Sequence, residues 1–153
     1  MKWLKYLGIM LVVVLVGIQF IPASLNQNTT VPPTDFIKAN DIPENVSHIL
    51  KASCYNCHSN NTEYPWYSRT QPAGWLLEKH IREGKEALNL SEFELYSVRM
   101  KGSKLRAMIG QVENGEMPLP SYTLLHPEAR LSREEKNDII NYLSILSEKL
   151  NGR

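Results

Sequence analysis

The feature that most constrains this chain is the motif Cys54-Tyr55-Asn56-Cys57-His58. Its spacing, C-x-x-C-H, is the attachment signature of c-type haem. Two thiols that lie one helical turn apart can each add to a vinyl group on the same edge of a porphyrin. The adjacent histidine then lies under the ring and can bind the iron. We therefore predict one covalent haem c, held by Cys54, Cys57 and His58.

Three other interpretations of the motif are weaker. A thioredoxin-like redox C-x-x-C belongs in a βαβ unit, and the sequence has no alternating pattern typical of strands. A structural zinc site commonly takes two C-x-x-C-like pairs, whereas this chain has two cysteines in all. A chance match of a short pattern is the third alternative. A disulfide framework is disfavoured too, because such frameworks need several cysteine pairs.

Residues 1–24 are predicted to target the chain. Lys2 and Lys5 precede a stretch from residue 7 to residue 21 that is apolar except for two glycines and Gln19. This pattern is typical of a signal peptide, although the apolar stretch is long for one and slightly short for a full membrane span of ~20 residues. We favour an uncleaved membrane anchor over a cleaved signal peptide. Both place the rest of the chain outside the cytoplasm, whereas a buried core helix is the least favoured interpretation.

The remainder divides into an extended tether, residues 25–42, and a haem-binding domain, residues 43–153. The tether is predicted from its Asn, Gln, Thr and Pro content. Within the domain, apolar residues recur at helical spacing and predict an all-α fold. The last helix is the clearest, because residues 132–135 form a capping box. Ser103 is predicted to cap the preceding helix, and Gly115 to end it. The predicted helices cover residues 44–54, 72–87, 91–100, 103–115 and 132–150.

Met117 is the predicted second axial ligand of the iron. It lies in the stiff loop Gly-Glu-Met-Pro-Leu-Pro, which could hold a thioether sulfur toward the iron. His80 and His126 are alternative ligands, and an open sixth position is a further alternative.

An aromatic cluster follows the motif and is predicted to line the haem pocket. Trp66, Tyr67 and Trp75 combine large apolar rings with polar tips that can hydrogen-bond a propionate. Arg69 can pair with a propionate carboxylate. Ordinary loop packing is the alternative for each of these side chains.

Longer stretches around these residues point to a known family. They are the run Cys-Tyr-Asn-Cys-His-Ser-Asn-Asn-Thr-Glu-Tyr-Pro-Trp-Tyr-Ser from Cys54, then Pro72-Ala-Gly-Trp75 and Gly115-Glu-Met117-Pro118. Over residues 43–150 the sequence resembles the small haem-binding-domain proteins of bacteria, relatives of the mono-haem c-type cytochromes. The resemblance implies a helical, cytochrome c-like fold around one covalent haem. It also implies that the carbonyl of Pro72 accepts a hydrogen bond from the second ring nitrogen of His58.

These features predict an electron carrier rather than an enzyme, because a haem with both axial positions filled has no place for a substrate. The expected partners are membrane or periplasmic redox proteins. The expected location is the periplasmic side of the bacterial inner membrane, or the periplasm if the segment is cleaved. The alternative is a haem-based module that binds small ligands or reacts with peroxide at an open or labile sixth site. The formal net charge of +1 gives no basis for nucleic-acid binding.

Overall fold

Helices make up the regular secondary structure of residues 2–28 and 30–152, which are the residues that the computed structural model describes. The described ranges leave out one residue of each predicted segment, namely Met1, Thr29 and Arg153. The all-α prediction is confirmed for the described residues, where the one strand-like pairing is the isolated bridge Gln27–Asn61. The α-helices are α1 (Lys2–Ile18), α2 (Phe36–Ala39), α3 (Glu44–Leu50), α4 (Asn56–His58), α5 (Ala73–Ala87), α6 (Val98–Glu113), α7 (Pro120–Thr123) and α8 (Arg133–Asn151). A π-helical turn, η1 (Lys51–Tyr55), and three 3-10 turns, η2 (Trp66–Arg69), η3 (Leu90–Leu95) and η4 (Pro127–Ala129), complete the set.

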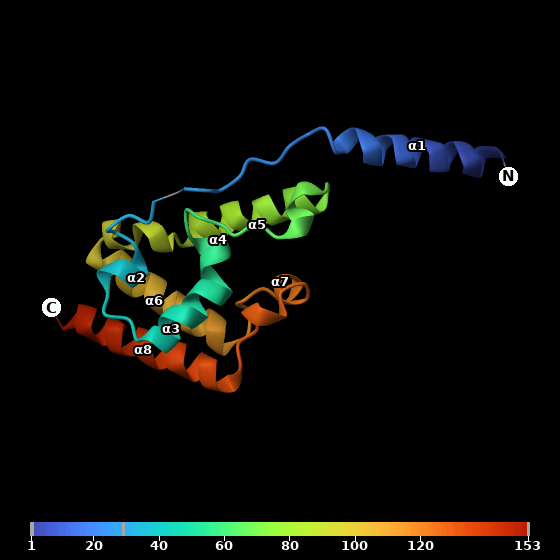
Figure 1. Ribbon diagram of the computed structural model, residues 1–153. Helices are drawn as coiled ribbons and strands as arrows, with labels where there is room; N and C mark the ends of the chain where they lie inside the picture. The colour runs from blue at the N-terminus through green and yellow to red at the C-terminus, as the bar shows by residue number, and fades with distance from the viewer. Residues whose placement is uncertain (1, 29, 153) are drawn as a thin grey trace.

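The core lies between α3, α6 and α8, and Figure 1 shows α8 along the lower edge of the domain, below both α3 and α6. Leu50, Leu105 and Leu143 project into it from the three helices and are fully buried. Such burial removes apolar surface from water and holds the helices together. The buried core residues are Phe36, Val46, Ile49, Leu50, Leu88, Leu90, Phe93, Leu105, Ile139 and Leu143.

Several helix boundaries follow the sequence pattern, and others do not. The Ser132 capping box is present at the start of α8, and α5 spans the predicted range. The prediction that Ser103 caps a helix is wrong, because α6 begins at Val98. The hydroxyl of Ser97 accepts a hydrogen bond from the amide of Met100 at 3.3 Å and so satisfies a free N–H of the first turn. The predicted helix over residues 91–100 is correspondingly replaced by η3 and the first turn of α6.

Two residues of the segment that is predicted to be an extended tether, Asn26 and Phe36, contact the domain. The Asn26 side-chain amide donates hydrogen bonds to the carbonyl of Ser59 at 2.8 Å and to the hydroxyl of Thr62 at 2.9 Å. Phe36 is fully buried, with its ring 4.7 Å from that of Phe93 in an edge-to-face arrangement. The residues that make these contacts are far apart in the sequence, so the content of polar residues and prolines in one segment does not predict the contacts.

Replacing Phe36 by alanine is expected to lower the free energy of unfolding by about 3–5 kcal/mol, because it empties a fully buried aromatic position. Chemical denaturation monitored by circular dichroism would measure the change. Val31→Ala is the matched control, since Val31 is exposed in the same segment and its loss should stay within about 0.5 kcal/mol. Equal stability of the two variants would contradict the packing of this segment on the core.

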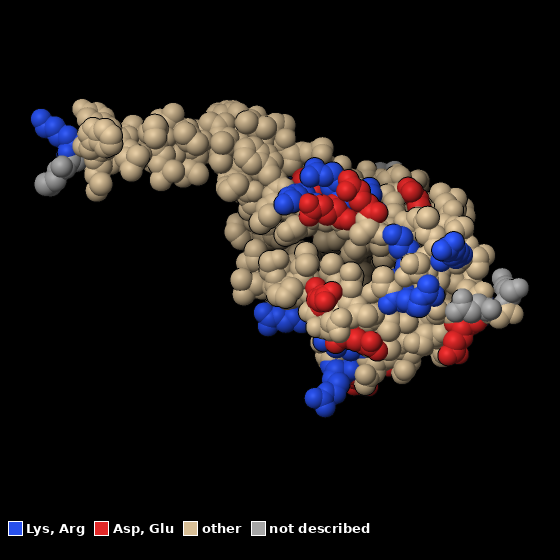
Figure 2. All heavy atoms as spheres, turned by 180° about the vertical axis from the view of Figure 1, so that it is seen from behind, with Lys and Arg blue, Asp and Glu red and all other residues tan. Residues whose placement is uncertain are grey.

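Helix α1 projects from the body and buries none of its side chains there (Figure 1). Figure 2 shows its surface as uncharged apart from lysines at its far end, while charges of both signs are interspersed over the visible face of the domain. The side chain of Gln19 joins the end of α1 to the domain, because it accepts from the amide of Gln71 at 2.9 Å and donates to the Gln71 carbonyl at 3.0 Å. Among the described helices, none is both long enough and apolar enough to cross a membrane.

Candidate functional site

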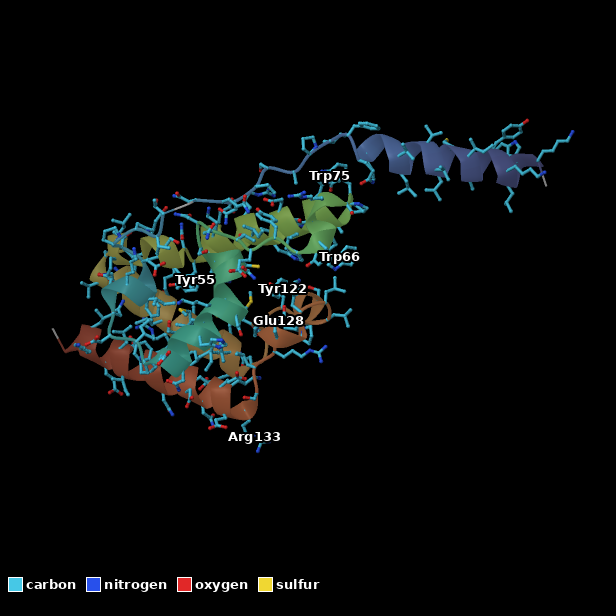
Figure 3. All side chains as sticks on the ribbon, viewed as in Figure 1. Tyr55, Trp66, Trp75, Tyr122, Glu128 and Arg133 are labelled. Carbon is cyan, nitrogen blue, oxygen red and sulfur yellow. The ribbon has the colours of Figure 1, made fainter. Side chains whose placement is uncertain are left out.

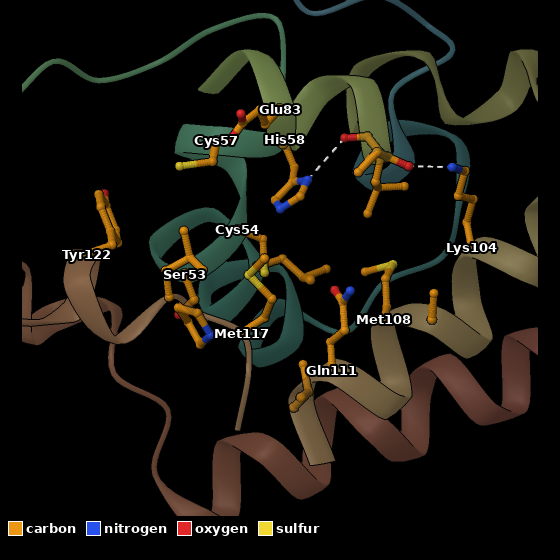
Figure 4. A pocket seen from close by; sticks show the side chains of 18 of the residues that line it. Ser53, Cys54, Cys57, His58, Glu83, Lys104, Met108, Gln111, Met117 and Tyr122 are labelled. Atoms are coloured by element: carbon orange, nitrogen blue, oxygen red, sulfur yellow. Dashed lines mark hydrogen bonds between the residues drawn. The ribbon is translucent and has the colours of Figure 1, made fainter. Parts of the chain in front are cut away.

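A cavity of about 390 Å³ lies between the helical run 44–58, helices α5 and α6, and the segment that leads into α7 (Figure 4). Its volume is in the range of small-molecule and cofactor sites. The helical run supplies the two cysteines and His58, and the segment before α7 supplies Met117. The structure therefore brings together the predicted attachment residues and both predicted axial ligands.

The attachment motif lies on one uninterrupted helical run, because α3 continues through η1 into α4. Cys54 belongs to the π-helical turn and Cys57 to α4, and both are free thiols that line the cavity. π-helical turns occur often at functional sites. Burial raises the pKa of Cys54 to about 12 and that of Cys57 to about 11, so both thiols of the polypeptide are protonated near neutral pH. The predicted helix end near Cys54 is thus too early, since the helix runs on to His58.

The ring of His58 is oriented by a backbone carbonyl. Its Nδ1 lies 3.1 Å from the carbonyl oxygen of Leu88, just after the end of α5. Burial lowers the pKa of His58, and hydrogen bonds to the carbonyls of Leu88 and Gly84 oppose that shift. A neutral ring that donates through Nδ1 leaves the lone pair of Nε2 for a metal, which is the arrangement that fixes the tautomer of a ligating histidine.

The carbonyl that accepts a hydrogen bond from His58 therefore belongs to Leu88, whereas the family resemblance implies the carbonyl of Pro72. The carbonyl of Pro72 instead accepts from the amide of Leu76 at 3.1 Å, as the first hydrogen bond of α5. A carbonyl already used in the first turn of a helix, at the opposite end of α5 from Leu88, is not the partner of His58.

Met117 faces the cavity from the side opposite His58 (Figure 4). Its loop is held by the end of α6, because the carbonyl of Gln111 accepts hydrogen bonds from the amides of Glu116 at 2.9 Å and Met117 at 3.1 Å. Gly115 has a φ of +71°, which a glycine adopts without the strain of a side chain and which turns the backbone out of α6. The loop is thus positioned by backbone contacts.

Helix α5 approaches the attachment helix closely at Gly84. A Cβ atom added there would lie 2.7 Å from the carbonyl oxygen of Cys57, closer than real Cβ atoms come to a backbone atom. Glycine is therefore required for this contact between α4 and α5, which sets the position of His58 against Leu88.

The predicted aromatic and cationic pocket residues lie outside the cavity wall. Trp66, Tyr67, Arg69, Pro72 and Trp75 are absent from its lining among the described residues. Trp66 is 87% exposed, and Figure 3 shows Trp66 and Trp75 at the end of the domain from which α1 emerges. Trp66 and Arg69 belong to turn η2 and are exposed, whereas Trp75 belongs to α5, so their predicted contact with a haem stays a prediction.

His126, an alternative iron ligand in the sequence-based prediction, has both ring nitrogens occupied. Its Nε2 lies 2.8 Å from the hydroxyl of Tyr67, and its Nδ1 lies 2.9 Å from a carboxylate oxygen of Glu128. Its ring stacks on that of Tyr122 with centroids 4.2 Å apart. Both ring nitrogens are thus engaged outside the cavity, whereas His80, the other alternative, does line it.

Several cavity residues have no counterpart in the sequence-based prediction. On α5 and α6 they recur at spacings of three, four and seven, so each set forms one helix face. The predicted helices over residues 72–87 and 103–115 contain these α5 and α6 residues, but helical spacing alone does not show which helix face lines a cavity. These residues are Ser53, Glu83, Gly84, Lys104, Met108, Gln111 and Tyr122.

Two thiols, an imidazole and a thioether around one cavity in an all-α domain fit a haem, whose iron accepts nitrogen and sulfur ligands. The molecule thus has a donor set that suits a haem protein. A family model described as the haem-binding domain matches residues 13–145. This chain therefore belongs to the haem-binding domain family. The comparisons with curated proteins and with solved structures gave no significant match. The family match begins within α1 and includes the segment that packs against the domain.

Proposed function

We propose that this protein is a one-electron carrier outside the cytoplasm, with one haem c attached to Cys54 and Cys57 and ligated by His58 and Met117. The observation that carries the proposal is the placement of His58 and Met117 on opposite sides of the cavity that both thiols line. Histidine and methionine are a recurring axial pair in electron-transfer haem proteins.

The surrounding residues support this role by holding the two ligands. The Leu88 carbonyl keeps the Nδ1 proton of His58 in place and so leaves Nε2 free. The Gln111 carbonyl restrains the loop of Met117. A bound haem supplies an iron centre that gains and loses one electron. A thioether ligand favours the reduced iron and raises the reduction potential. With both axial positions filled, the chain keeps substrates away from the iron.

We further propose that residues 1–24 attach the protein to the periplasmic side of the inner membrane, where membrane or periplasmic redox proteins exchange electrons with it. The support is the exposure of most apolar side chains of α1, none of which is buried against the domain. An exposed apolar helix favours a nonpolar environment. The face of the domain seen in Figure 2 carries charges of both signs, which gives that face no strong electrostatic preference for a partner.

Met117→Ala tests the ligation. The unmodified chain, matured in a host that assembles c-type haem, is expected to show a low-spin ferric spectrum with a weak far-red sulfur-to-iron band. The variant is expected to lose that band, because alanine offers no sulfur. Visible absorption spectroscopy of the ferric protein measures both.

Met108→Ala is the matched control, since it removes a second thioether that lines the same cavity from α6. It is expected to keep the far-red band. A band lost in Met108→Ala and kept in Met117→Ala would contradict ligation by Met117. A high-spin spectrum that neither substitution changes would favour the small-ligand or peroxide-reactive alternative.

A further inference from the structure

One cation faces the cavity from the side away from the cysteines. Among the described residues that line the cavity, Lys104 is the only lysine or arginine. Figure 4 shows it across the cavity from Cys57, whereas the carboxylate of Glu83 lies on the same side as Cys57. The cavity therefore has a negative side chain near one cysteine and a positive side chain at its opposite end.

Lys104 has neutral partners in the described structure. Its ammonium donates a hydrogen bond to the carbonyl of Ala87, the last residue of α5, and lies 5.9 Å from the centroid of the Tyr96 ring. No carboxylate of the described residues forms an ion pair with it. An ammonium group has three donors, so it can keep the carbonyl contact and still bind an anion.

The two ends of the cavity lie beside different residues of α5. His80 and Ala87 are seven residues apart, which is about 10 Å along a helix. Gly84 packs against Cys57 between them, and Lys104 is bonded at the Ala87 end. The cation is therefore displaced from the thiols toward the C-terminal end of α5.

The separation of Lys104 from the cysteines can be compared with the two edges of a haem. The two vinyl groups lie on one edge of the porphyrin, and the two propionate carboxylates lie on the opposite edge. If the vinyl edge is joined to Cys54 and Cys57, the carboxylates must point away from both cysteines. Charge-assisted hydrogen bonds from lysine to a carboxylate are among the stronger polar contacts in proteins.

We propose that Lys104 binds the propionate edge of the haem, an inference that rests on the proposed attachment at Cys54 and Cys57. It replaces Arg69, which the sequence suggests for this role and which lies outside the cavity wall. His80 is at the other end of the α5 face, and Glu83 would repel a carboxylate. Lys104 thereby orients the carboxylates and adds a positive charge beside the redox centre.

The test compares Lys104→Gln, Lys104→Arg and Arg69→Gln in the full chain loaded with haem. Lys104→Gln is expected to shift the propionate-sensitive resonance Raman bands. It should also lower the ratio of reduced to oxidised protein at a fixed potential by about tenfold, because loss of a nearby positive charge favours the oxidised form. Tenfold corresponds to about 59 mV for one electron. Lys104→Arg should keep both properties close to those of the unmodified chain, and Arg69→Gln should change neither.

The competing role for Lys104 is structural, since its bond to Ala87 also satisfies a carbonyl at the end of α5. A structural role would lower the stability of Lys104→Gln and leave the Raman bands and the potential unchanged, and that result would overturn the proposal. Extraction of haem from the unmodified chain by acidified acetone is a separate outcome. It would contradict covalent attachment itself and, with it, the orientation that places the carboxylates at Lys104.

Discussion

Replacing both Cys54 and Cys57 by serine is expected to abolish covalent haem attachment. These are the only two cysteines of the chain, and both line the cavity beside His58. A serine hydroxyl does not add to the vinyl groups under the conditions that form a thioether. Haem staining on a denaturing gel, which retains only covalent haem, should fall from a full signal to none. Each single substitution should leave one thioether and so retain the stain, with an altered pyridine haemochrome band.

Ser53→Ala is the matched control for this experiment, because Ser53 is the neighbour of Cys54 and lines the same cavity. It is expected to retain full staining. Haem that stays on the denatured double-serine chain would contradict attachment through the motif. Normal staining in Ser53→Ala shows that a change in the cavity wall does not by itself prevent maturation.

Gly84→Ala is expected to destabilise the domain by about 1–3 kcal/mol through overpacking. The added Cβ would lie 2.7 Å from the carbonyl oxygen of Cys57, and a backbone atom cannot move aside as a side chain can. The loss should occur although alanine favours a helix over glycine by about 1 kcal/mol. Chemical denaturation would measure it, and separation of α4 from α5 should also reduce the fraction of chains that carry haem.

Gly110→Ala is the matched control, since Gly110 also lies within an α-helix and an added Cβ there meets nothing within 4 Å. Helix propensity should then dominate and raise the free energy of unfolding by about 0.5–1 kcal/mol. The two substitutions are chemically identical and should have opposite signs. Similar stabilisation by both would contradict the close approach of α4 and α5.

The sequence predicts best those features that depend on near neighbours in the chain. The capping box at Ser132 needs a hydroxyl and a carboxylate three residues apart, and the structure confirms it. The all-α class follows in the same way from apolar spacing within each helix. The start of α6 fails because Ser97 and Ser103 both precede apolar residues, and a local pattern does not choose between them.

The residues that line the cavity were not predictable from their distance to the motif along the chain. Trp66 and Arg69 are close to the motif in sequence and have suitable chemistry, yet η2 turns them outward. Lys104 is far from the motif in sequence and reaches the cavity only because α6 packs along it. Nearness along the chain is thus a poor guide to which side chains surround a cofactor.

The sequence by itself determined the helical class, the cysteine and histidine motif and its likeness to haem-binding proteins, because each depends on residue type at short spacing. The tertiary structure alone decided that Leu88 rather than Pro72 orients His58 and that Phe36 packs against Phe93. It also decided that Met117 faces His58 across one cavity. These outcomes depend on how helices distant in sequence pack, and packing is set by the shape and volume of all the contacting side chains together.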